Sequence, residues 1–172
     1  MDYIDRFQGL LASLTDSILV KNDSQGNRIE VCFYVESGAN LKEISSLESK
    51  LDVKLPKTFI EFLKNFNGAR LYDYEGLDGF QIFGTSELID ANNFAKNTFE
   101  EDWSNDIVVF AKYIGESNYL GFMVEREVNE YPIVDCFFEE LPSDWKIIDT
   151  SFSSFMNNLL DKEGQKYWLV TN

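Results

Sequence analysis

The side chains of this sequence that could do chemistry are mainly carboxylates. The chain has 172 residues, of which 30 are Asp or Glu, and it contains no histidine. The lack of histidine excludes Ser-His-Asp and Cys-His catalysis, imidazole zinc sites and the usual proton shuttle near neutral pH. The two cysteines, Cys32 and Cys136, lie inside apolar runs, and we therefore expect two buried thiols rather than a disulfide or a metal site.

Carboxylates alone leave an enzymatic and a metal-binding alternative. Paired acids serve glycosidases, and the acidic loop 72–79 offers Asp73, Glu75 and Asp78 as oxygen ligands for Mg²⁺ or Ca²⁺, although their spacing does not match an EF-hand. The segment 115–119 is similar to a nucleophile elbow but lacks its last glycine and a histidine base. Because isolated acidic clusters are usually solvated loops, we expect no catalysis, no cofactor and no metal.

The acidic residues are concentrated in the segment 97–149. This segment holds 13 acids and 3 bases, and thus ten of the fifteen net negative charges. Such charge steers a basic partner, and a tryptophan can anchor that partner where it is exposed. The residues that we expect to bind a partner are Glu100, Glu101, Asp102, Trp103, Asp106, Glu116, Glu139, Glu140, Asp144 and Trp145. The alternative is a solvated acidic surface that keeps the protein soluble.

The net charge of −15 also limits the classes of partner. Nucleic-acid phosphates and anionic lipid surfaces would repel this chain, so we expect no direct binding of nucleic acid and no association with membranes. The longest apolar runs, 31–35 and 107–111, are far shorter than the ~20 residues of a membrane helix. The first six residues include two acids, unlike the positively charged start of a secretory signal, and we expect a cytoplasmic protein.

Hydrophobic periodicity predicts one α+β domain over residues 1–172. Helices are expected at 2–20, 41–51, 86–96 and 151–162, and a further helix is expected to start at Pro56. Strands are expected at 28–36, 80–84, 107–112, 118–124 and 132–138. Because the strands gather in the second half instead of alternating with helices, we predict one antiparallel sheet of about five to six strands with helices packed on one side.

The segment 41–68 is predicted to be a helix pair with a shared apolar seam. Asn40 and Glu43 can form a capping box at the first helix, and Pro56 suits the first position of the second. Asn67-Gly68 is expected to end the second helix. The apolar residues Leu55, Phe59, Phe62, Leu63 and Phe66 are spaced to fill a core, each contributing roughly 1.5–3 kcal/mol by burial.

This helix pair resembles the signature of the SUKH superfamily, which includes the yeast cell-wall-assembly regulator and many bacterial toxin-immunity proteins. The matching residues are Leu55, Pro56, Phe59, Phe62, Leu63, Phe66, Asn67 and Gly68. The resemblance covers roughly residues 40–162 and leaves 1–36 as an extension. It implies a SUKH-like fold and a non-catalytic immunity protein that neutralises a cognate toxin, often a nuclease, and we expect that toxin to have a basic surface. The eukaryotic members imply an alternative, an intracellular regulatory or scaffold module.

Overall fold

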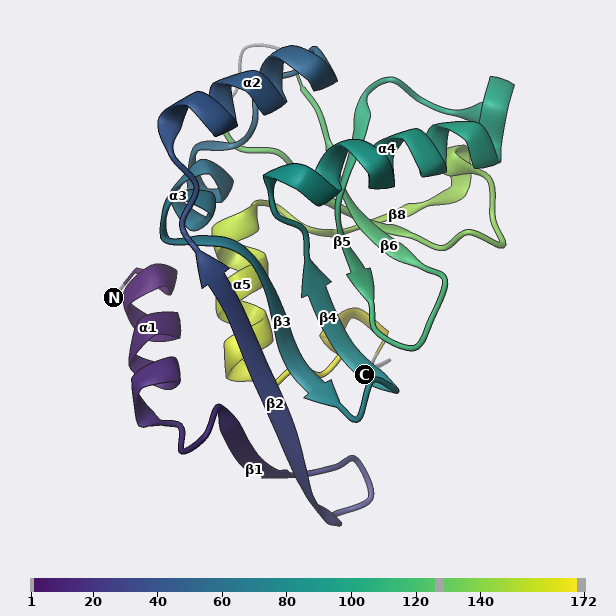
Figure 1. The fold of residues 1–172 in the computed structure, drawn as a ribbon. Coiled ribbons are helices and arrows are strands. Elements are labelled where there is room, and N and C mark those ends of the chain that lie inside the picture. The colour runs from purple at the N-terminus through teal and green to yellow at the C-terminus, as the bar shows by residue number, and fades with distance from the viewer. Residues whose placement is uncertain (1, 126–128, 170–172) are drawn as a thin grey trace.

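The structure is a computed structural model that describes residues 2–125 and 129–169. Eight strands form one sheet in chain order, and every neighbouring pair is antiparallel (Figure 1). The strands are β1 (Ile18–Asn22), β2 (Arg28–Ser37), β3 (Phe66–Tyr74), β4 (Asp78–Ile82), β5 (Ile107–Tyr113), β6 (Tyr119–Met123), β7 (Ile133–Cys136) and β8 (Lys146–Asp149). The helices are α1 (Tyr3–Ser13), α2 (Leu41–Leu51), α3 (Lys57–Asn65), α4 (Thr85–Phe99) and α5 (Phe152–Asp161), with short 3₁₀ turns η1 (Glu100–Asp102), η2 (Pro142–Asp144) and η3 (Tyr167–Leu169). The α+β class and the single antiparallel sheet are therefore confirmed.

Helices cover both faces of the sheet. On one face, α1, α3 and α5 enclose an aromatic core, in which the Phe59 ring lies 5.0–6.3 Å from four other phenylalanine rings. On the opposite face, Ala95 of α4 packs with Val109 of β5 and Val134 of β7. Figure 1 shows α5 behind the sheet and α4 in front of β5. The prediction that the helices pack on one side of the sheet is wrong. Residues 107–111 of β5 are all buried, and because successive side chains of a strand point to opposite faces, both faces of the sheet are covered there.

The first predicted helix is too long. The helix α1 ends at Ser13, and Asp16 and Ser17 both adopt positive φ, at 52° and 63°. These two residues turn the chain into β1, which pairs with the first half of β2. Asp23 closes this hairpin by accepting hydrogen bonds from the backbone N–H groups of Gln25 and Asn27. The helical spacing of the apolar residues extends to Ile18, but Ile18 pairs with Cys32 of β2 and therefore lies in a strand.

The helix pair is confirmed, but its end is not at Asn67-Gly68. Asn40 accepts hydrogen bonds from the backbone of α2 and Glu43 bonds back, so the predicted capping box is present. The helix α3 stops at Asn65, and β3 begins at Phe66. Gly68 has φ +105°, and a Cβ there would lie 3.0 Å from the backbone nitrogen of Gly84. The glycine thus allows β3 to approach the start of α4 and is not a helix stop.

The sheet has eight strands instead of five to six, because three strands escaped prediction. The missed strands are β1, β3 and β8, and β3 includes residues 72–74, which we expected in an acidic loop. The strands predicted at 28–36, 80–84, 107–112, 118–124 and 132–138 are confirmed with small shifts at their ends, as is the helix that starts after Ser151. Within the described residues, no helix is long and apolar enough to cross a membrane.

Candidate partner-binding face

The helix α4 is fixed to the sheet by the side chain of Asn92. Its amide nitrogen donates to the carbonyl oxygen of Val109 at 2.9 Å, and the Val109 N–H donates to the Asn92 amide oxygen, also at 2.9 Å. β4 ends at Ile82, so no strand of the described residues pairs with Val109 on that side of β5. Asn92 therefore replaces a neighbouring strand, and it fixes the position of the following turn of α4.

That turn carries Phe94 onto a layer of aromatic rings, which we call the aromatic platform. The platform consists of Phe94, Phe99, Trp103, Tyr119, Phe138 and Trp145. Phe138 is central: its ring stacks on Tyr119 at 4.8 Å between centroids and on Phe94 at 6.4 Å, and meets the edge of Phe99 at 4.9 Å. Phe94 is 55% exposed, so the platform reaches solvent.

The two tryptophans have different places in the platform. Trp145 is only 7% exposed, and its indole N–H donates to the carbonyl oxygen of Phe137 at 3.0 Å. Trp103 is half-buried, with its ring 6.2 Å from that of Trp145. Trp145 therefore lies on the buried side of the platform, whereas Trp103 and Phe94 remain partly accessible to solvent.

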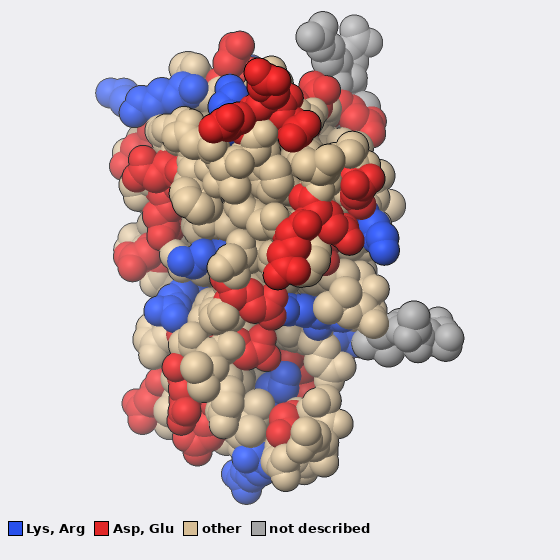
Figure 2. All heavy atoms as spheres, turned by 90° about the vertical axis from the view of Figure 1, so that its right-hand side faces the viewer, with Lys and Arg blue, Asp and Glu red and all other residues tan. Residues whose placement is uncertain are grey.

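The contact between the tryptophans also brings two acidic segments together. Trp103 directly follows η1, which contains Glu100, Glu101 and Asp102, and Trp145 directly follows η2, which ends with Asp144. We call the surrounding carboxylates the acidic rim: Glu100, Glu101, Asp102, Asp106, Glu139, Glu140 and Asp144, all of which are exposed. No ion pair within the described residues involves a member of this rim. Figure 2 shows this side of the molecule, with groups of carboxylates around uncharged surface in its upper half.

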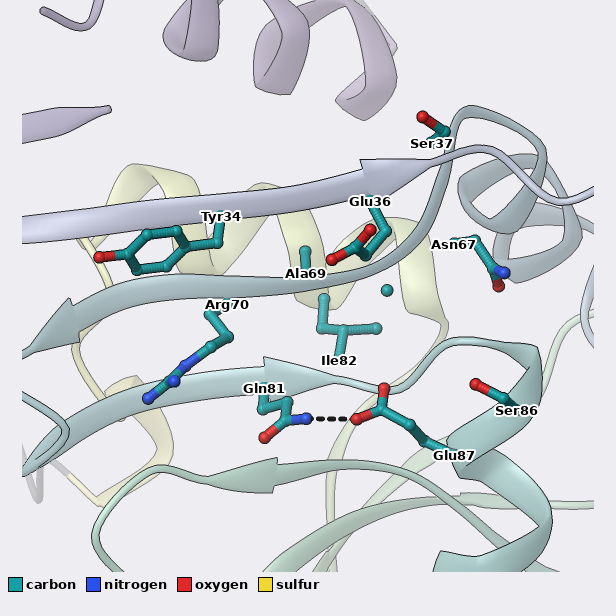
Figure 3. A pocket seen from close by; sticks show the side chains of 11 residues that line it. Tyr34, Glu36, Ser37, Asn67, Ala69, Arg70, Gln81, Ile82, Ser86 and Glu87 are labelled. Atoms are coloured by element: carbon teal, nitrogen blue, oxygen red, sulfur yellow. Dashed lines mark hydrogen bonds between the residues drawn. The ribbon is translucent and has the colours of Figure 1, made fainter. Parts of the chain in front are cut away.

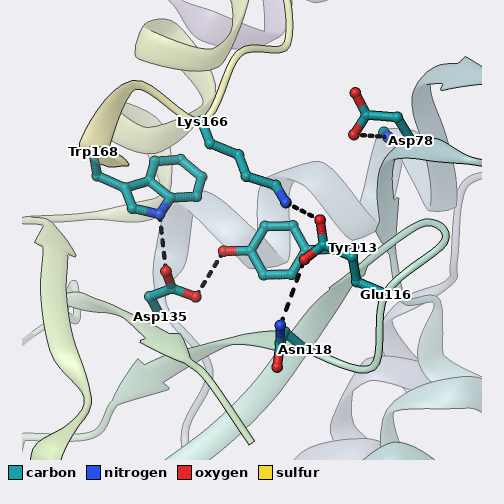
Figure 4. A network of polar contacts seen from close by, with 8 residues as sticks. Asp78, Tyr113, Glu116, Asn118, Asp135, Lys166 and Trp168 are labelled. Atoms are coloured by element: carbon teal, nitrogen blue, oxygen red, sulfur yellow. Dashed lines mark hydrogen bonds and ion pairs between the residues drawn. The ribbon is translucent and has the colours of Figure 1, made fainter. Parts of the chain in front are cut away.

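Glu116 has a structural partner, unlike the residues of the acidic rim. It lies in the turn between β5 and β6, and its carboxylate pairs with Lys166 (Figure 4). The Lys166 ammonium lies over the ring of Tyr113, 4.2 Å from the centroid. Asp135 accepts from the Tyr113 hydroxyl at 2.8 Å and from the Trp168 indole at 2.9 Å. Glu116 therefore belongs to a network that holds the segment after α5 against the sheet.

Two further titratable groups at the platform, Tyr119 and Cys136, favour their uncharged forms. Burial raises the pKa of the Tyr119 hydroxyl. Burial, together with the nearby Asp135 carboxylate, raises the pKa of the Cys136 thiol well above its usual value. Neither group is an activated nucleophile at neutral pH, so the chemistry of the face is that of aromatic surface surrounded by negative charge.

The acidic loop does not assemble into a cation site. Asp73 is buried; one carboxylate oxygen pairs with Arg70 at 2.9 Å and the other accepts from the backbone of Gly76 at 2.8 Å. Asp78 accepts from the backbone of Gly79. Among residues 2–125 and 129–169, no three Asp, Glu or Cys side chains lie together in a way that would hold a metal ion.

Sequence reasoning missed four of the six rings of the aromatic platform. The acidic segments and the two tryptophans were predicted, but Phe94 and Phe99 of α4, Tyr119 of β6 and Phe138 of the loop after β7 were not. Their contact depends on the register between β6 and β7, which pairs Tyr119 with Cys136. The local signal for Phe94 is that it is a single aromatic residue, directly after two asparagines, within the predicted helix 86–96.

Comparisons with known proteins identify a family that matches most of this chain. The SMI1 / KNR4 family (SUKH-1) matches residues 38–158, which include the helix pair, the platform and most of the sheet. The chain is also 24% identical over 145 residues to an uncharacterized protein, YnaB, from Bacillus subtilis, covering 82% of this chain and 90% of the relative. A second uncharacterized protein of that organism, YobM, is 24% identical over 148 residues, covering 84% of this chain and 78% of the relative. From the family match over most of its length, the chain belongs to the SMI1 / KNR4 (SUKH-1) family.

Proposed function

We propose that this protein is a bacterial immunity protein that acts in the cytoplasm. It binds a cognate protein toxin with a basic surface and neutralises it stoichiometrically, without catalysis. The observation that carries this proposal is the combination of a solvent-accessible aromatic platform with an acidic rim in which no described ion pair neutralises the carboxylates. Membership of the SUKH-1 family supports it, because the superfamily includes many immunity proteins.

The two parts of the face have different roles in this proposal. The acidic rim acts at a distance and accelerates encounter with a basic surface, such as the substrate groove of a nuclease. The aromatic platform acts at contact, because aromatic side chains surrounded by polar residues are typical centres of binding energy. Phe94 is the exposed ring of the platform, and Trp103 is half-buried next to the carboxylates of η1, so we propose these two as the anchors.

The test uses the protein encoded next to this chain's gene, because immunity and toxin genes are expected to be neighbours. A variant with Glu100, Glu101, Asp102 and Asp106 changed to amides should bind more slowly, and the dependence of its association rate on salt should be weaker. Its dissociation rate should change little, because exposed charges act mainly through a field that is screened within about 10 Å at 0.1 M salt. Association that is already slow and independent of salt in the unmodified protein would contradict the electrostatic part.

The matched control removes the same number of charges elsewhere. Glu30, Glu61, Glu75 and Asp90 are exposed residues outside the segment 97–149, and no side-chain hydrogen bond or ion pair is found for them within the described residues. Changing these four residues to amides removes the same number of negative charges as the changes in the acidic rim do. If both variants slow association to the same extent, net charge alone guides the encounter and the acidic rim has no special role.

A further inference from the structure

The strand β2 has an open edge along its second half. β1 pairs with β2 only as far as Cys32, because the chain turns away at Asp16 and Ser17. β3 pairs with the other edge of β2 from Cys32 to Ser37. All residues from 34 to 38 are exposed. The second half of β2 therefore has a strand on one side only.

The backbone groups on this edge have no hydrogen-bond partner among the residues that the structure describes. The N–H of Phe33 points to the β1 side, where it donates to the carbonyl oxygen of Ser17 at 2.9 Å. Because N–H and C=O groups alternate in direction along a strand, those of Val35 and Ser37 point to the same side. No hydrogen bond to another described residue is found for them on that side. Unpaired backbone groups in a row are a template for another extended chain.

The outward side chains of this half-strand line a hollow of about 500 Å³. Tyr34 and Glu36 line it from β2, and Glu87 from α4 (Figure 3). Figure 3 shows the carboxylates of Glu36 and Glu87 reaching into the hollow from opposite sides. The positive charge of Arg70, at the other end, is compensated by Asp73 at 2.9 Å. Glu36 has no hydrogen bond or ion pair to another described residue, so its carboxylate is available to a cation.

We propose that β2 binds an extended segment of the partner protein, which adds to the sheet as a strand along Val35–Ser37 and places a Lys or Arg side chain beside Glu36. The unpaired backbone groups define the ligand as an extended chain, and the Glu36 carboxylate selects a basic side chain on its outward face. Glu87 lies beyond β3 and accepts hydrogen bonds from Gln81 and from the backbone of Gly84, so it adds negative charge to the hollow without contacting the added strand. The identity of the partner rests on the proposed function, but the mode of binding does not. This contact is separate from the aromatic platform and lies at the opposite end of α4.

The experiment uses a synthetic probe, an acetylated seven-residue peptide in which Lys alternates with Val or Thr. Its binding is followed by amide NMR of the full chain, with expected shifts and slowed hydrogen exchange at Val35 and Ser37. Two further peptides carry N-methyl groups, one on every Lys and the other on every Val and Thr. In an added strand only one of these two sets of amides faces β2. One methylated peptide should therefore bind at least roughly tenfold more weakly, since it loses two or more backbone hydrogen bonds, and the other should bind like the parent.

Equal retention or equal loss of binding by the two methylated peptides would overturn the proposal, as would NMR shifts confined to the acidic rim.

Protein variants test the role of charge separately. Glu36→Gln should weaken binding of the parent peptide several-fold and reduce its dependence on salt. Glu30→Gln is the matched control, because Glu30 is an exposed residue of the same strand that pairs with Val20 of β1. Equal effects of the two variants on peptide binding would show that Glu36 does not contact the peptide. Because these tests need no toxin, they can fail or succeed independently of the immunity assignment.

Discussion

Replacing Asn92 by alanine should destabilise the protein far more than its partial exposure suggests. The change removes both hydrogen bonds to Val109, whose N–H and C=O groups lie on a residue with 0% exposure. Each buried backbone group left without a partner costs about 1–3 kcal/mol, while alanine recovers about 0.5 kcal/mol through its higher helix propensity. With each group at the middle of this range, we therefore expect Asn92→Ala to lower the free energy of unfolding by about 3–4 kcal/mol.

The assay is urea denaturation followed by circular dichroism, with Asn93→Ala as the control. Asn93 is the next residue of α4, is exposed, and makes no side-chain hydrogen bond to a described residue. For a urea dependence of about 2 kcal/mol per molar, Asn92→Ala should lower the unfolding midpoint by about 1.5–2 M, and Asn93→Ala should leave it nearly unchanged. Similar midpoints for the two variants would refute the role of Asn92 as a substitute for a strand.

Three further predictions concern the core, the buried tyrosines and the aromatic platform. Phe59→Ala should lower the free energy of unfolding by about 3–5 kcal/mol, because Phe59 is fully buried among four other rings. A loss below about 1 kcal/mol in urea denaturation would contradict this packing. Burial, with the nearby Asp135 and Asp149, raises the pKa of Tyr113 and Tyr167 above the unfolded value of about 10. The contribution of these two tyrosines to stability should therefore be constant below pH ~10 and fall as the pH rises further, and a urea midpoint that is unchanged between pH ~10 and pH ~11 would refute this. Phe94→Ala should weaken binding of the neighbouring gene's product at least roughly tenfold, whereas Leu77→Ala, which removes another exposed apolar side chain, should have no effect on the measured dissociation constant.

The fold was largely predictable where local signals and tertiary packing agree. The capping box at Asn40 and Glu43 and the apolar seam that includes Phe59 located the helix pair. Prediction failed where pairing overrides local pattern, as at Ile18, which has helical spacing but pairs with Cys32 in a strand. The helix predicted at 86–96 is confirmed as α4, but the face of the sheet that it covers was not predicted, because the sequence does not state which face a helix covers.

The candidate site was predictable in its charges but not in its geometry. Composition located the acidic segment, and the acids beside Trp103 and Trp145 showed that aromatic surface and charge occur together. The burial of Trp145 and the exposure of Phe94 depend on the fold of the whole chain, since the two residues meet the same ring of Phe138 from different elements. The open edge of β2 could not be predicted, because it exists only where β1 stops pairing.

The proposed immunity function requires that this protein neutralise a toxin by binding it in a fixed ratio. A titration tests this requirement, in which the toxic activity of the neighbouring gene's product is followed while the purified protein is added. We expect a linear loss of activity that ends at a fixed molar ratio, together with a weaker effect of the variant that lacks the charges at Glu100, Glu101, Asp102 and Asp106. Activity that persists at a large molar excess of this protein would show that it is not an immunity protein for that product.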